Sequence, residues 1–146
     1  LVKRGMPVAE AARRAATLIA AMRRELADAE VDGWQPLEGT FGLPDPNDEH
    51  VVATAVIAGA GAIVTENLKD FPADRIPPGI QVLSAREFAK NTVALNPRLA
   101  LAAVHEIANR SGRYGATLAV GEILETLRDR YGMIEAVDMM TEAESA

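Results

Sequence analysis

The feature that most constrains the fold is an acid-rich turn that runs directly into an apolar helix, over residues 43–55. Asp45 is a suitable N-cap, Pro46 suits the first helical position, and Asp48 falls at the third, where the helix dipole favours negative charge. The helix, predicted over residues 46–59, is broadly apolar, as is typical of a helix that packs on a sheet. Capping alone accounts for the acids, but the same carboxylates could also hold a metal ion.

Two short apolar segments after this helix are predicted to be strands of a parallel sheet. They cover residues 62–65 and 80–83, and a loop over residues 66–78 separates them. Residues 34–37 are a further candidate strand, which Pro36 would restrict to a sheet edge or an irregular segment. The order helix, strand, crossover, strand is typical of a parallel α/β sheet.

Helices are predicted for most of the remaining chain. Apolar residues at i, i+3, i+4 and i+7 predict a helix over residues 8–30. Ser84 and Glu87 have the spacing of a capping box, which opens a helix that runs to Leu95. After Leu95, the sequence predicts helices only. The predicted ranges are 97–110, 116–131 and a short helix over 133–140, and the tail 141–146 is expected to fray.

The change near residue 95 predicts two parts, an α/β domain over residues 1–95 and a helical appendage over residues 96–146. The chain of 146 residues is long enough for one domain with a real core plus such an appendage.

The chain has no cysteine, which excludes a disulfide scaffold and a thiolate metal site and fits a reducing compartment. It has no membrane-length apolar run and no signal-peptide pattern. We therefore expect a cytoplasmic protein without a membrane partner.

The net charge of −6 argues against a broad basic surface for nucleic acid. It does not exclude a nuclease, because the metal site of a nuclease is itself acidic. Basic residues do cluster locally in the first predicted helix and near the end of the chain. We interpret these pairs as solvated helix faces.

Polar residues stand where a parallel sheet would bring them to one edge. Asn67 and Asp70 follow the strand that is predicted to end at Thr65, and Asp45 and Asp48 begin the preceding helix. Helix N-termini and strand C-termini share the ligand-binding edge of a parallel layer. Carboxylate and amide oxygens suit Mg²⁺ or Mn²⁺, which keep several waters and need few carboxylates. The alternative is that these acids only cap a helix and fill a polar turn, and their spacing leaves both interpretations open.

Two motifs resemble the second half of a PIN domain. They are D-P-N-D-E-H at residues 45–50 and T-E-N-L-K-D-F-P at residues 65–72. PIN domains are metal-dependent ribonucleases, and in bacteria many are VapC-type toxins of toxin–antitoxin pairs. The most similar variant carries an extra C-terminal helical region. The resemblance extends over residues 8–140 and implies a PIN-like (Rossmann-like) parallel sheet with flanking helices.

The resemblance implies a role for five side chains. Asp48 matches the family acid that opens the helix, and Asp70 matches the acid of the D-F pair, so these two are the expected catalytic residues. Asn67 matches the Asp or Asn just past the strand, and Asp45 is an additional acid of this variant. Asp48, Asp70, Asn67 and Asp45 would therefore hold the metal. Thr65 matches a small hydroxyl residue that closes the strand and could bond a metal ligand.

The chain departs from the family at its beginning. Family members start with a strand that ends in an aspartate, and a following helix supplies a glutamate. No such strand precedes Val8, and Glu10 stands too early in its helix to be that glutamate. The resemblance therefore implies an N-terminally truncated domain with half a metal site. A homo-oligomer or a separate N-terminal fragment would cover the exposed flank. We expect His50 to pack or cap rather than to take part in catalysis.

The expected function is an Mg²⁺- or Mn²⁺-dependent endoribonuclease of a toxin–antitoxin system. It would hydrolyse RNA with a metal-activated water, would be restrained by a cognate antitoxin, and could be inactive as this fragment. The alternative is a catalytically inactive PIN scaffold that binds a partner protein, which the acidic balance and the missing ligands favour. A flavodoxin-like response module is a weaker third reading, because no predicted strand ends in the aspartate that it needs.

Overall fold

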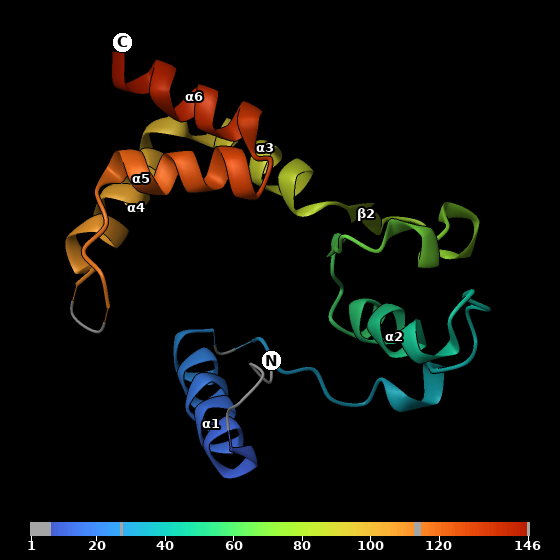
Figure 1. The fold of residues 1–146 in the computed structure, drawn as a ribbon. Helices are drawn as coiled ribbons and strands as arrows, with labels where there is room; N and C mark the ends of the chain where they lie inside the picture. Colours follow the sequence, from blue (N-terminus) through green and yellow to red (C-terminus); the bar gives the residue numbers. More distant parts are fainter. Residues whose placement is uncertain (1–6, 27, 113–114, 146) are drawn as a thin grey trace. The chain divides into compact units, whose positions relative to one another are not determined.

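The computed structural model describes residues 7–26, 28–112 and 115–145 (Figure 1). Its described part is mixed α/β and mostly helical, with a small parallel sheet of two strands. The chain divides into two compact units, residues 1–60 and 61–146. This division differs from the expected boundary near residue 95, because the residues on both sides of that position belong to the second unit. No helix in the described part of the chain is both long enough and apolar enough to cross a membrane.

The first unit begins with an amphipathic helix, α1 (Val8–Glu25), whose apolar stripe is exposed. None of its side chains is buried, and Leu18 on the stripe is 59% exposed. The helix ends five residues before the predicted limit at residue 30, so that boundary was wrong. Acids at positions 28, 30 and 32 explain the early end, because negative charge is unfavourable at a helix C-terminus. The guanidinium of Arg23 instead donates a hydrogen bond to Glu30 at 2.8 Å.

The rest of the first unit leads into a short buried helix. The strand predicted over residues 34–37 is wrong, because η1 (Gln35–Leu37) is a 3₁₀ turn with a proline near its start. A second 3₁₀ turn, η2 (Pro46–Asp48), runs directly into α2 (Glu49–Ile57). Together they confirm most of the helix predicted over residues 46–59. The buried apolar side chains of α2 are Val52, Ala53 and Ala55.

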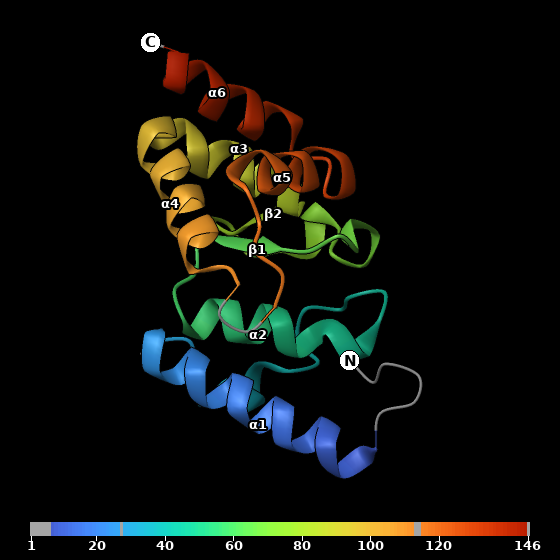
Figure 2. The ribbon, with the colours of Figure 1, turned by 60° about the vertical axis from the view of Figure 1, so that its left-hand side comes forward.

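The second unit begins with the parallel sheet (Figure 2). Strands β1 (Ala62–Val64) and β2 (Gln81–Leu83) are parallel neighbours, each one residue shorter than predicted. The predicted loop between them contains two 3₁₀ turns, η3 (Leu68–Asp70) and η4 (Ala73–Arg75). The prediction of a parallel pair is confirmed. A wider PIN-like sheet stays a proposal.

Helices complete the second unit. Helices α3 (Ala85–Leu95) and α4 (Pro97–Arg110) confirm their predicted ranges. The helix predicted over residues 116–131 starts four residues late, as α5 (Val120–Glu125), and continues as the π-helical turn η5 (Thr126–Arg130). The prediction of a frayed tail is wrong, because α6 (Ile134–Ser145) remains helical almost to the end of the chain.

The core of the second unit lies among its helices, which Figure 1 shows gathered together. Its buried residues come from α4 and α6, and they are Leu101, Val104, Val137 and Met140. Burying each such side chain contributes about 1.5–3 kcal/mol. This anchoring of α6 explains why its last turn is helical, although the sequence there is polar.

Candidate functional site

Three of the predicted site residues form one hydrogen-bonded group at the carboxyl edge of the sheet. The Thr65 N–H donates to the Leu83 carbonyl at 2.9 Å, which extends the strand pairing by one residue. The Thr65 Oγ1 accepts the N–H of Asn67 at 3.0 Å, and the Asn67 side-chain amide donates to the Asp70 carboxylate. We call Thr65, Asn67 and Asp70 the edge cluster.

A local turn and one buried ring fix the edge cluster. The Asp70 N–H donates to the Asn67 carbonyl at 3.2 Å, which closes the η3 turn. The next residue, Phe71, is buried and anchors the end of that turn. Asn67 is exposed and Asp70 is half-buried, so polar oxygens of the cluster lie within reach of solvent. Asn67 and Asp70 therefore lie together after the strand, while their predicted convergence with Asp45 and Asp48 stays a prediction.

The start of α3 adds polar groups to the same edge. Ser84 is 2% exposed, and its hydroxyl accepts the N–H of Glu87 at 3.3 Å. The Glu87 carboxylate accepts the Ser84 hydroxyl at 2.6 Å and the Ser84 N–H at 2.9 Å. These two bonds hold the pKa of Glu87 below its usual range. The predicted capping box is confirmed. Its hydrogen bonds occupy the Glu87 carboxylate at the start of α3.

Sequence reasoning missed Glu66, which lies between two members of the edge cluster. Its carboxylate accepts the backbone N–H of Ala85 at 3.0 Å, across 19 residues of sequence. The sequence signal was faint, since a single acid in a polar loop has no periodicity. The parallel register was needed to bring the two segments together.

The other two predicted acids lie in the first unit. Asp45 accepts the backbone N–H and the side-chain amide of Asn47, each at 2.9 Å, so its predicted capping role is confirmed. Asp48 is half-buried and does not cap α2 with its side chain. The capping interpretation therefore accounts for Asp45 and leaves Asp48 without a capping role.

Glu49 is the buried acid of this turn, and sequence reasoning missed it. It is 2% exposed, and its carboxylate accepts the N–H groups of Leu43 at 2.8 Å and Phe41 at 3.0 Å. Burial alone would raise the pKa of Glu49, but the backbone N–H groups together hold that pKa below its usual value. Glu49 therefore fixes the loop that leads to Asp45, and it is unsuited to binding a metal.

His50 contacts the turn before α2 and the ring of Trp34. Its Nδ1 lies 2.6 Å from the Asn47 carbonyl, and its ring centroid lies 6.0 Å from that of Trp34. These contacts agree with the expected packing role. Trp34 is half-buried.

The fit of a divalent metal can be judged from the donors in each unit. Taken alone, neither unit brings together three His, Cys, Asp or Glu side chains that could hold a metal, as far as its residues are described. The second unit offers the carboxylate of Asp70 and the amide of Asn67. One carboxylate with neutral oxygens and several waters is a donor set that Mg²⁺ accepts. The edge cluster therefore fits a weakly held hard cation and is no closed cage.

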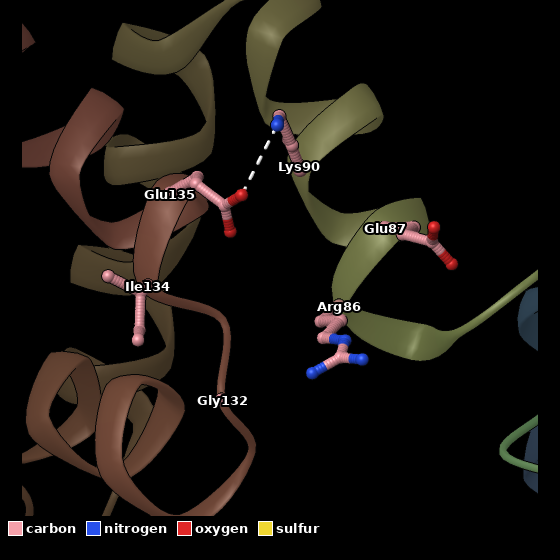
Figure 3. Close-up of a pocket in the computed structure, with 6 residues that line it drawn as sticks. All are labelled: Arg86, Glu87, Lys90, Gly132, Ile134 and Glu135. Atoms are coloured by element: carbon pink, nitrogen blue, oxygen red, sulfur yellow. Dashed lines mark hydrogen bonds and ion pairs between the residues drawn. The ribbon is translucent and has the colours of Figure 1, made fainter.

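Two cavities of the second unit lie outside the edge cluster. One, of about 450 Å³, lies against α3 and α6 and is lined by Arg86, Lys90 and Glu135, among others. Figure 3 shows its Lys90–Glu135 ion pair, at 3.2 Å, with Glu87 directed away from it. The other, of about 540 Å³, is an apolar groove along β2, and Leu68 and Phe71 belong to its lining. No predicted site residue lines either cavity.

Comparison with known proteins gave no relative: no family model, no curated protein and no solved structure matches the chain. Among the described residues, the edge cluster is the arrangement with the most definite chemistry.

Proposed function

We propose that the chain belongs to an Mg²⁺- or Mn²⁺-dependent endoribonuclease of PIN type, which hydrolyses RNA phosphodiester bonds. The edge cluster is the observation that carries this proposal, because it places a carboxylate and an amide side by side where parallel sheets bind ligands. The D-P-N-D-E-H and T-E-N-L-K-D-F-P motifs support the same assignment.

The proposal gives each residue of the edge cluster a distinct role. Asp70 supplies the negative charge that holds the cation, and Asn67 supplies a neutral oxygen. Thr65 holds the backbone of Asn67 through its hydroxyl. The motif resemblance also assigns a metal-binding role to Asp48 and Asp45. A bound cation would supply an activated water and neutralise charge on the phosphate.

The proposal also includes a setting and partners. We place the protein in the cytoplasm, which the absence of cysteine supports. RNA is its substrate, and a cognate antitoxin protein restrains it. The exposed apolar stripe of α1 supports a protein partner, either another copy of the chain or a separate polypeptide.

An RNA-cleavage assay with Mn²⁺ tests the proposal. Wild-type protein should cleave a mixed-sequence RNA, and a chelator should stop it. Asp70→Asn keeps the side-chain shape but removes the charge, so it should lower the rate by at least about tenfold. Asp48→Ala should also lower it. Asp74→Asn, at an exposed acid in the neighbouring turn, is the matched control and should cleave at the wild-type rate. Equal cleavage by wild type and Asp70→Asn would contradict the proposal.

The second candidate is a catalytically inactive scaffold that binds a partner protein. It is favoured by the small donor set, since neither unit alone gathers three ionisable metal ligands within its described residues. It predicts no RNA cleavage by any variant at any Mn²⁺ concentration. Metal-dependent cleavage that disappears in Asp70→Asn would exclude it.

A further inference from the structure

The edge cluster is tied to the start of α3 by a single acidic side chain. Glu66 stands between Thr65 and Asn67, and its carboxylate accepts the Ala85 N–H at 3.0 Å. The partner of Glu66 is a backbone group on a different element. The bond can therefore fix the position of the loop relative to the start of α3, in addition to its local conformation.

The register of the sheet explains why Glu66 can reach this partner. Val64 lies opposite Leu83, so two residues further along Glu66 is level with Ala85. The backbone pairing ends at the bond from Thr65 to the Leu83 carbonyl, because the chain then turns into α3. The Glu66 side chain thus continues the connection between the two segments where backbone pairing is no longer possible.

The start of α3 gains from the same bond. The first N–H groups of a helix have no partner inside the helix, and the helix dipole favours a carboxylate beside them. The Ser84 hydroxyl accepts the N–H of Glu87, and Glu66 accepts that of Ala85. Each of these two N–H groups therefore has its own acceptor.

We propose that Glu66 is a positioning residue for the metal site: it holds the loop of Thr65 and Asn67 at the place where Asn67 and Asp70 can share a cation. This inference rests on the proposed function. In this role Glu66 acts through its bond to the Ala85 N–H and is not itself a metal ligand. It sets the place of the loop, while Asn67 and Asp70 supply the ligands.

Three variants of the whole chain test this role. Glu66→Ala removes the acceptor, and Glu66→Gln keeps an oxygen that can accept the Ala85 N–H. The matched control is Glu122→Ala, because Glu122 accepts the Ala119 N–H at 2.7 Å at the start of α5, away from the edge cluster in sequence. Amide hydrogen exchange of Ala85 and Asn67 is measured by NMR without metal. Mn²⁺ affinity is measured separately by electron paramagnetic resonance.

Glu66→Ala should raise the exchange rates of the Ala85 and Asn67 amides about tenfold and weaken Mn²⁺ binding by a similar factor. Glu66→Gln should stay within about threefold of wild type, because a neutral acceptor remains. Glu122→Ala should change neither quantity at this edge.

Two results would overturn the inference. One is unchanged exchange of the Asn67 amide in Glu66→Ala. The other is an equal loss of Mn²⁺ affinity in Glu66→Ala and Glu122→Ala, which would reduce the effect to general stability. If wild-type protein binds no Mn²⁺, the proposed function fails and the metal-site role of Glu66 fails with it, while the exchange rates still decide whether Glu66 fixes the loop.

Discussion

Two neighbouring acids in the turn before α2 have different environments although they look alike in sequence. Glu49 is 2% exposed and accepts backbone N–H groups, whereas Asp48 is half-buried and does not cap its helix. From the sequence, Asp48 and Glu49 could each be an acid of the first helical turn that the helix dipole stabilises. Only the path of the preceding loop, which folds back over α2, decides which carboxylate is enclosed.

Removing the Glu49 carboxylate should destabilise the first unit. Glu49→Ala leaves the N–H groups of Leu43 and Phe41 without their acceptor, so we expect a loss of about 2–4 kcal/mol in the free energy of unfolding. Trp34, the only tryptophan, lies in this unit, so its fluorescence can follow denaturant unfolding. Glu38→Ala, at an exposed acid, is the control and should change little. A loss no larger than that of the control would contradict this role.

Stability should also depend on pH through Glu49. Its pKa in the folded chain is below its ordinary value, so folding favours the ionised form. Its contribution is therefore present above the unfolded pKa and is lost as the pH falls through the folded pKa. In urea unfolding followed from neutral to acidic pH, the difference between wild type and Glu49→Gln should shrink in acid. A difference that stays constant or grows would show that the carboxylate is not stabilised in its ionised form.

At the scale of elements, the sequence predicts features that depend on neighbouring residues, such as helix starts. It does not predict features that depend on tertiary contacts. The Ser84–Glu87 capping box and Pro97 fixed the starts of α3 and α4, because both act within one helical turn. The end of α6 was misjudged, because burial of Met140 is a tertiary effect that outweighs a polar tail. The bond from Glu66 was missed for the same reason, since it depends on strand register.

The helices of the second unit should depend on the α4–α6 core. Leu101→Ala removes a side chain that is 7% exposed and should cost about 2–4 kcal/mol of unfolding free energy. Leu99→Ala, on the same helix but 67% exposed, is the matched control and should stay within about 0.5 kcal/mol. Thermal unfolding followed by circular dichroism compares the two. Equal losses of unfolding free energy in the two variants would contradict a core between α4 and α6.

At the scale of the molecule, the predicted site residues are divided between the two units. Thr65, Asn67 and Asp70 were predicted from sequence and do form one group, while Asp45 proves to be engaged as a cap. The sequence indicates the grouping of Thr65, Asn67 and Asp70 because the end of a strand and the turn after it are close together in the chain.

The net charge of −6 means that cations will also gather loosely over the surface, so a test must separate a specific site from that background.

The most direct test of the account is a Mn²⁺ titration of the whole chain, followed by paramagnetic broadening of backbone amides. The account predicts that broadening appears first at residues 65–71, is lost in Asp70→Asn, and persists in Asp74→Asn. Broadening that spreads evenly over exposed acids, or that is the same in both variants, would contradict a metal site at the edge cluster.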